Sequence, residues 1–99
     1  MLNIKKKLEE DRLTVTLEGR LDTTSAPELE KALQEDISDV KELVMDFEKL
    51  DYISSAGLRV LLSTQKVMNK QGSMKLCHVN ESIMEILEVT GFVDILTIE

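Results

Sequence analysis

Residues 43–58 have the sequence Leu-Val-Met-Asp-Phe-Glu-Lys-Leu-Asp-Tyr-Ile-Ser-Ser-Ala-Gly-Leu. This segment begins with a continuous apolar run, Leu43–Met45, which is typical of a strand covered on both faces, as in a parallel sheet. A loop is predicted over Glu48–Ile53, and a helix is predicted to begin at Ser55. A buried strand followed closely by a helix is the unit from which α/β folds are built.

The sequence after residue 58 continues this alternation. The helix from Ser55 is predicted to extend to Lys70 and to end at Gly72, which would serve as a C-cap. Apolar residues at helical spacing predict its buried face, namely Leu58, Leu61, Leu62, Val67 and Met68. Its exposed face is predicted to carry Arg59, Ser63, Lys66 and Asn69. Three further elements are predicted: a strand over Met74–Val79, a helix capped by Asn80 and ended by Gly91, and a last strand over Val93–Ile98.

The sequence before residue 43 predicts two strands and a helix. Leu2, Ile4 and Leu8 suggest a first strand, and a turn is predicted over Glu9–Arg12. Leu13, Val15 and Leu17 alternate with polar residues, which is the period of a half-buried strand. The segment Ser25-Ala26-Pro27-Glu28 resembles a capping box at a helix start. The apolar stripe of that helix is predicted to be Ala26, Leu29, Leu33 and Ile37.

This order of elements predicts an α/β fold. We expect one domain over residues 1–99, with a small mixed, mostly parallel β-sheet and three to four helices packed on one face. The other face of the sheet should then remain partly exposed.

Composition limits the classes of function. The 99 residues, of which 42% are hydrophobic and 31% charged, are typical of one globular domain. The net charge of −7 argues against binding to nucleic acid or to anionic membranes. No apolar run approaches the roughly 20 residues needed to span a bilayer, so we expect no membrane insertion. Cys77 is the only cysteine, which fits a reducing compartment and predicts a cytoplasmic protein.

Residues with catalytic chemistry are few. His78, the only histidine, follows Cys77 in a predicted strand, where successive side chains point to opposite faces. We therefore expect neither a Cys–His dyad nor a metal site from this pair. The glycines do not form a phosphate-binding loop. The sequence predicts a protein that is not an enzyme and that needs no cofactor.

The segment Asp51–Leu58 stands out because it lies at the predicted carboxyl end of a strand, where α/β proteins usually place function. Ser54 and Ser55 are suited to cap the helix, and capping needs no further role. Gly57 costs about 1 kcal/mol relative to Ala inside a helix. We expect a close approach at this position, and packing against the sheet would also explain it.

Three motifs, in this order along the chain, resemble those of the anti-sigma-factor antagonists, a family of stand-alone STAS domains. Gly19-Arg20-Leu21-Asp22 is similar to the family's Gly-x-Leu-Asp motif. Ser54-Ser55-Ala56-Gly57-Leu58 is similar to its signature, and Val89-Thr90-Gly91-Phe92 to its turn after the last conserved helix. The fold that this resemblance implies is a STAS-like domain, in agreement with the predicted elements.

The resemblance also implies a mechanism, which is partner switching. The unphosphorylated domain binds an anti-sigma factor that is itself a serine kinase, and this binding releases a sigma factor. The kinase then phosphorylates the serine two positions before the signature glycine, here Ser55, which ends the binding until a serine phosphatase restores it. Many members carry Asp before that serine where this chain has Ser54, so Ser54 is the alternative acceptor.

The expected partner surface combines the helix Ser55–Lys70 with the loops Gly19–Thr24 and Glu48–Ile53, because these segments cluster at one end of the predicted sheet. Its expected residues are Asp22, Thr23, Thr24, Tyr52, Ile53, Ser54, Ser55, Ala56, Gly57 and Arg59. Arg59 either pairs with an acid of the partner or with the phosphate, or is an ordinary solvated arginine. Two other classes of function remain as alternatives: a STAS subunit of a membrane transport complex, and a small enzyme or nucleotide-binding protein.

Overall fold

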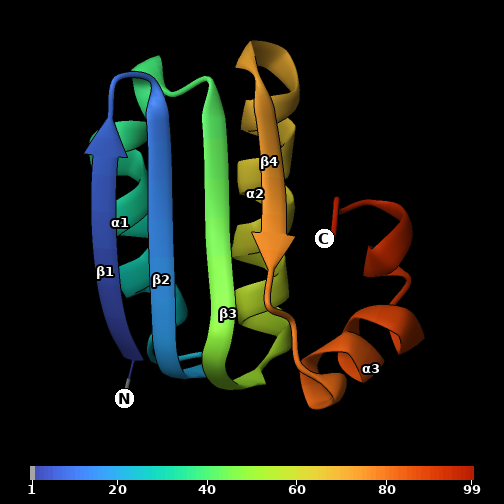
Figure 1. The fold of residues 1–99 in the computed structure, drawn as a ribbon. Coiled ribbons are helices and arrows are strands. Elements are labelled where there is room, and N and C mark those ends of the chain that lie inside the picture. Colours follow the sequence, from blue (N-terminus) through green and yellow to red (C-terminus); the bar gives the residue numbers. More distant parts are fainter. Residues whose placement is uncertain (1) are drawn as a thin grey trace.

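A four-stranded sheet with the strand order β1-β2-β3-β4 forms one layer of the molecule (Figure 1). The computed structural model describes residues 2–99. Its strands are β1 (Leu2–Glu9), β2 (Arg12–Leu21), β3 (Glu42–Ile53) and β4 (Ser73–Cys77). β1 and β2 are antiparallel and joined by the predicted tight turn, whereas β3 is parallel to both β2 and β4. The predicted mixed, mostly parallel sheet is confirmed.

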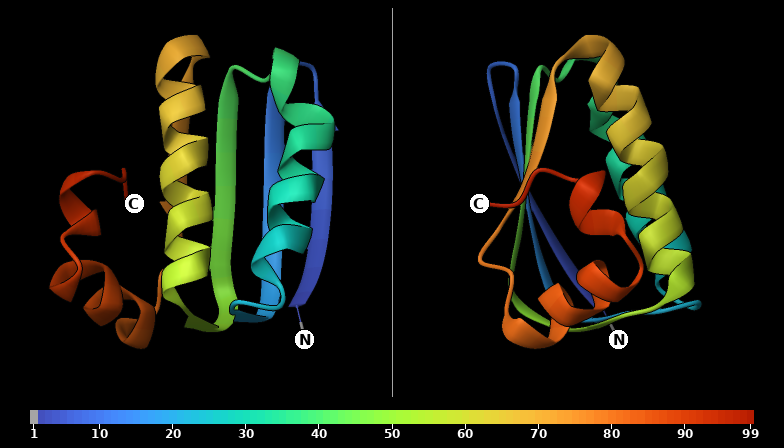
Figure 2. Two further views of the ribbon diagram at one scale, coloured as in Figure 1. Left: turned by 180° about the vertical axis from the view of Figure 1, so that it is seen from behind. Right: turned by 90° about the vertical axis from the view of Figure 1, so that its right-hand side faces the viewer.

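Helices form the second layer. They are α1 (Ala26–Asp36), α2 (Ser55–Gln71) and α3 (Glu81–Val89), and short 3-10 turns follow α1 at Ile37–Asp39 and α3 at Phe92–Asp94. α1 and α2 lie side by side on one face of the sheet, and α3 lies beyond the β4 edge (Figure 2). The opposite face carries no helix among the described residues, so the expected helix-free face is present.

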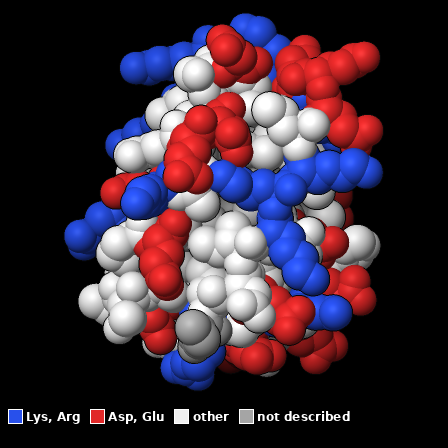
Figure 3. Space-filling view, turned by 90° about the vertical axis from the view of Figure 1, so that its left-hand side faces the viewer, with Lys and Arg blue, Asp and Glu red and all other residues white. Residues whose placement is uncertain are grey.

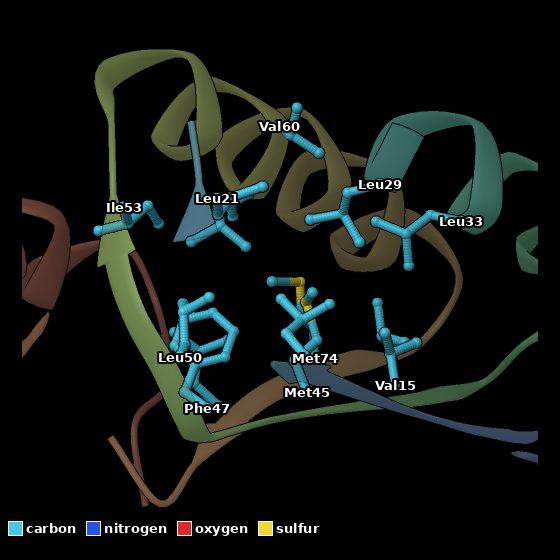
Figure 4. Packing of buried hydrophobic residues seen from close by; sticks show 14 of the residues in the cluster. Val15, Leu21, Leu29, Leu33, Met45, Phe47, Leu50, Ile53, Val60 and Met74 are labelled. Carbon is cyan, nitrogen blue, oxygen red and sulfur yellow. The ribbon is translucent and has the colours of Figure 1, made fainter. Parts of the chain in front are cut away.

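The hydrophobic core fills the space between the sheet and the helices. Leu13, Val15 and Leu17 of β2 are fully buried, as their alternation with polar residues predicts. Leu29 and Leu33 of α1 are also buried and lie across the core from Val15 (Figure 4). The apolar stripe predicted for α1 is correct, except that Ile37 begins the 3-10 turn after the helix.

The buried face of α2 differs in part from the prediction. Leu58, Leu61 and Met68 are buried as expected, but Leu62 is only half-buried and Val67 is 42% exposed. Val60, Thr64 and Gln65 are buried instead. Val60 is on the side of α2 that faces α1 (Figure 4), so the buried arc is set by two neighbours, the sheet and α1, rather than by the sheet alone. The four residues predicted to face water are all exposed, namely Arg59, Ser63, Lys66 and Asn69.

The prediction of a loop over Glu48–Ile53 is wrong, because these residues extend β3. They pair with the end of β2, as in the pairs Gly19↔Leu50 and Leu21↔Ile53. Two register shifts interrupt the pairing, so Phe47, Leu50 and Ile53 all reach the core although they are three residues apart. Such bulges break the period of two that identifies a strand in sequence.

The helix ends have specific causes. Asn80 caps α3 as predicted, and its Oδ1 accepts a hydrogen bond from the Ile83 N–H at 2.9 Å. Gly72 ends α2 in an extended conformation, and a Cβ there would lie 1.9 Å from the Lys41 carbonyl oxygen. Gly72 is the C-cap as predicted, but a glycine is required there because the Lys41 backbone passes close by, and not because the backbone is left-handed.

The predicted last strand, Val93–Ile98, is wrong. Phe92–Asp94 forms a 3-10 turn, and only Ile98 makes a β-bridge, to Leu76. Thr97 and Glu99 nevertheless complete backbone hydrogen bonds with Leu76, both at 2.9 Å. The chain end therefore pairs with the free edge of β4. The other edge, β1, exposes lysines over Lys5–Lys7 among charges of both signs (Figure 3), which opposes edge-to-edge association.

Candidate functional site

The carboxyl ends of β2 and β3 meet at one edge of the sheet because the two strands are parallel. Leu21 pairs with Ile53, and the Ser54 N–H donates a hydrogen bond to the Leu21 carbonyl oxygen at 2.8 Å. The loop before α1 and the junction before α2 are therefore neighbours, as the sequence predicts. Function in α/β proteins is usually placed at this end of a sheet.

The two serines at the start of α2 have different environments. Ser54 is the N-cap, and its Oγ accepts a hydrogen bond from the Gly57 N–H at 3.4 Å. Ser55 is the first residue of the helix and is exposed. The first turn of a helix presents unpaired N–H groups and the positive end of the helix dipole. Ser55 thus offers an accessible hydroxyl at a position that tolerates negative charge.

Gly57 is explained by packing within the protein. It is buried, and a Cβ would lie 2.7 Å from Leu21 Cγ and 3.0 Å from Ile53 Cγ1. Ile53 is itself 2% exposed. Gly57 and Ile53, which we expected in the partner surface, therefore pack α2 against the sheet. Neither residue offers side-chain surface to a partner.

The loop between β2 and α1 is organised by Asp22 and Ser25. Asp22 Oδ1 accepts hydrogen bonds at 3.0 Å from the N–H groups of Thr24 and Ser25. Hydrogen bonding, first from the Ser25 N–H, holds the pKa of Asp22 below its usual value. The buried Ser25 Oγ donates to the Arg20 carbonyl oxygen at 2.7 Å and accepts from the Asp22 N–H at 2.9 Å.

The predicted capping box of α1 is therefore wrong, because the Ser25 side chain is committed to the loop and not to the helix. The consequence is a hydrogen-bonded loop on which Thr23 and Thr24 are exposed, with Thr23 in the groove beside Ala56 of α2.

Arg20 is a residue of the site that sequence reasoning missed. Its guanidinium lies 4.4 Å from the centroid of the Tyr52 ring, a cation–π distance. Tyr52 is 37% exposed, so the pair adds an aromatic and cationic surface beside the loop. Arg20 falls within the Gly-x-Leu-Asp motif, but its contact depends on the pairing of Arg20 with Tyr52 across the strands.

A groove of about 160 Å³ lies between the starts of α1 and α2. Its lining residues are Thr23, Ala26, Pro27, Glu30, Ala56, Arg59 and Val60. Arg59 is exposed on its rim, one turn after Ser55. The structure therefore brings Thr23, Ala56 and Arg59 of the predicted set together in one groove, close in sequence to the exposed Ser55.

The expectation that Cys77 and His78 point to opposite faces is wrong. His78 has a φ of +56°, which ends β4 and turns the ring back toward Cys77. As a result, ligand atoms of Asp46, Cys77 and His78 all lie within 4.8 Å of one another. Burial, and then the neighbouring Asp46, raises the pKa of the Cys77 thiol, which does not favour a nucleophilic thiolate.

Comparison with known proteins assigns the family. A family model described as the STAS domain matches residues 3–99. The chain belongs to the STAS domain family. Over residues 2–99 this STAS domain has no helix that is long and apolar enough to cross a membrane.

Relatives of this STAS domain include anti-sigma factor antagonists. The anti-sigma-B factor antagonist of Bacillus subtilis is 32% identical over 98 residues, which cover 98% of this chain and 90% of the relative. The crystal structure of an anti-sigma factor antagonist from Mycobacterium paratuberculosis aligns with a TM-score of 0.89 at 20% identity, covering 99% and 85% of the two chains. The phosphorylated form of SpoIIAA, a Bacillus cell fate determinant, aligns with a TM-score of 0.77 at 15% identity, covering 98% and 91%.

Proposed function

We propose that this STAS domain is an anti-sigma factor antagonist that binds an anti-sigma factor and thereby releases a sigma factor. The proposal is supported by the family and by the names of the relatives at 32% and lower identity. It is a binding function, in which the domain itself performs no catalysis. It operates in the cytoplasm, where sigma factors meet RNA polymerase.

The single observation that carries the proposal is the exposure of Ser55 on the surface described above. The Ser54 hydroxyl is used by the N-cap, whereas the Ser55 hydroxyl is accessible at the first position of α2. A partner that covers Ser55 and the neighbouring groove would also meet Thr23 and Arg59, which supply polar and cationic contacts. Aromatic and arginine side chains are enriched among the residues that dominate binding energy.

Ser55 is the phosphorylation site in this proposal, and the anti-sigma factor is the kinase, which binds ATP and transfers its γ-phosphoryl group to the Ser55 hydroxyl, releasing ADP. The phosphorylated SpoIIAA structure motivates the assignment, because that protein shares the fold and exists in a phosphorylated form. A phosphate at Ser55 would lie at the positive end of the α2 dipole, where the fold accommodates an anion. A serine phosphatase would return the domain to the binding state.

The experiment that tests the proposal is affinity capture from the native cytoplasm, with the unphosphorylated domain as bait. We expect an ATP-binding anti-sigma kinase among the captured proteins and displacement of its sigma factor when purified antagonist is added. Capture of a transporter ATPase without any anti-sigma factor would instead support the transport-complex alternative. A Ser55→Glu bait, which places an anion on the surface, serves as the control and should capture far less kinase.

A further inference from the structure

Asp46 and Cys77 are cross-strand neighbours on the face of the sheet that α1 and α2 leave uncovered. They pair in the register of β3 and β4. The adjacent residues Met45 and Leu76 are buried in the core, so the alternation of side chains directs Asp46 and Cys77 to the opposite face. His78 follows directly, and its left-handed backbone returns the ring to the same face. Three side chains with different donor atoms are thereby gathered at one point.

The donor atoms of these three side chains lie close enough together to bind one ion. His78 Nδ1 lies 3.1 Å from Asp46 Oδ1, and one donor atom from each of the three residues lies within 4.8 Å of the others. Asp46 Oδ1 also accepts a hydrogen bond from the Glu48 N–H at 3.0 Å, which orients the carboxylate. The Glu48 carboxylate is 4.0 Å from His78 Nδ1, so a fourth oxygen is close by.

We propose that Asp46, Cys77 and His78 bind one Zn²⁺ ion. Zinc accepts thiolate, imidazole and carboxylate ligands at about 2.0–2.3 Å in a tetrahedral arrangement, which places ligand atoms about 3.3–3.8 Å apart. The observed separations reach this range with side-chain adjustments of about 1 Å. The fourth position is filled by Glu48 or by water.

The donor set selects the class of ion. A sulfur and an imidazole nitrogen favour Zn²⁺ and similar transition metals, whereas Mg²⁺ and Ca²⁺ require sets of oxygen ligands. A surface hydrogen bond between His78 and Asp46 would by itself leave Cys77 without a role. A zinc ion at this point would tie the end of β4 to β3 on the face opposite the helices, and it would not touch Ser55.

The test is titration of the tag-free, reduced protein with Zn²⁺, and with Co²⁺ as a spectroscopic probe. We expect one ion per chain with micromolar affinity, a thiolate-to-Co²⁺ charge-transfer band, and a higher melting temperature with Zn²⁺ but not with Mg²⁺. Cys77→Ser should remove the band. Asp46→Asn and His78→Asn should each weaken Zn²⁺ binding at least about tenfold, the lower end of the loss found even for outer-shell partners.

The His78→Asn and Glu81→Gln variants separate loss of a zinc ligand from changes in backbone conformation or charge. Asn retains the preference for a left-handed backbone at position 78, so that variant loses the imidazole without a new conformational demand. Glu81→Gln removes the same charge as Asp46→Asn at an exposed position outside the cluster and should leave Zn²⁺ affinity unchanged. If Cys77→Ser does not fold, the Co²⁺ spectrum of the unaltered protein and the His78→Asn titration decide. Affinity weaker than micromolar, equal binding of Mg²⁺, or full affinity in any of the three ligand variants would overturn the proposal.

Discussion

Ser54 and Ser55 carry the same hydroxyl group but have different functions in the structure. The Ser54 hydroxyl stabilises the start of α2 by accepting from the Gly57 N–H, and Ser55 leaves its hydroxyl exposed. A kinase needs an accessible acceptor, so the residue-scale geometry favours Ser55 over the alternative acceptor, Ser54. Substitutions at the two positions should therefore separate stability from modification.

Ser55→Ala should abolish phosphorylation by the partner kinase and leave the free energy of unfolding within about 0.5 kcal/mol of the unaltered protein. Ser54→Ala should still gain one phosphate but lose about 0.5–1 kcal/mol, because it removes a long N-cap hydrogen bond. Intact-mass and peptide mass spectrometry, together with urea unfolding, measure both effects. A phosphate found mainly at Ser54 would contradict the assignment.

Asp22 predicts a dependence of stability on pH. Because hydrogen bonds lower its pKa in the folded state, Asp22 contributes stability that is fully present above the unfolded-state pKa of about 3.9. This contribution is lost as the pH falls through the folded-state pKa. The difference in free energy of unfolding between the unaltered protein and Asp22→Asn should therefore be larger at neutral pH than at a pH below the folded-state pKa of Asp22. Urea unfolding measures this difference. Asp94→Asn changes the same charge at an exposed position, and equal profiles for both variants would refute the role of Asp22.

At the scale of elements, the position of α2 relative to the sheet decides the shape of the site. The first turn of α2 contacts Leu21 of β2 and Ile53 of β3 at Gly57, so two strand ends and one helix start are locked together. The exposed surface then consists of the loop before α1 and the outward side of α2. Changes at the buried and the exposed sides of this turn should have different consequences.

Gly57→Ala should destabilise the protein by about 1–3 kcal/mol, because the new Cβ would overlap Leu21 and displace α2. Helix propensity alone predicts the opposite change, because it favours Ala over Gly by about 1 kcal/mol. Urea unfolding measures the change. Ser63→Ala, at an exposed position of the same helix, is the control and should be nearly neutral. A Gly57→Ala protein of unaltered stability would show that the close packing is not needed.

Arg59→Ala should weaken binding of the anti-sigma factor about tenfold, which corresponds to about 1.4 kcal/mol, without changing the melting temperature. The reason is its exposed position on the groove rim, one turn after Ser55. Titration calorimetry measures the affinity, and Lys70→Ala at the far end of α2 removes the same charge away from the site. Equal affinities for the unaltered protein and Arg59→Ala would make Arg59 an ordinary solvated arginine.

For the whole molecule, the question is whether phosphorylation changes the fold or only its surface. A phosphate adds about −1.5 to −2 charges at neutral pH. At the start of α2 this charge meets the positive end of the helix dipole, and the residue that carries it is exposed. The main cost therefore arises in the complex, where the anion would be desolvated against a surface that fits a hydroxyl.

The phosphorylated protein should thus lose measurable affinity for the anti-sigma factor while its circular dichroism spectrum stays unchanged and its melting temperature nearly so. Each tenfold loss of affinity corresponds to only about 1.4 kcal/mol. The cost of desolvating a phosphate in the interface is therefore sufficient to abolish binding. Ser55→Asp, with one charge and fewer oxygens, should reproduce the effect incompletely. A much earlier melting transition or a loss of helix signal would indicate a folding switch instead.

Local patterns in the chain were sufficient for the class of fold and for the meeting of two loops at one edge of the sheet. The alternation in β2, the apolar stripe of α1 and the cap at Asn80 depend on residues near one another in sequence, so their periods and spacings could be recognised directly. Parallel strands must carry their following loops to one edge, which explains why the loop at Asp22–Thr24 and the start of α2 were correctly expected to meet.

Other features exist only because distant segments meet. Residues 48–53 are a strand because β2 supplies their hydrogen bonds through two register shifts, and Gly57 is required because Leu21 lies across from it. Arg20 reaches Tyr52 through the same pairing, and Cys77, His78 and Asp46 converge through a left-handed residue next to β3. These contacts depend on register, backbone sign and close approach between strands, which have no local periodic signal, and only the tertiary structure decides them.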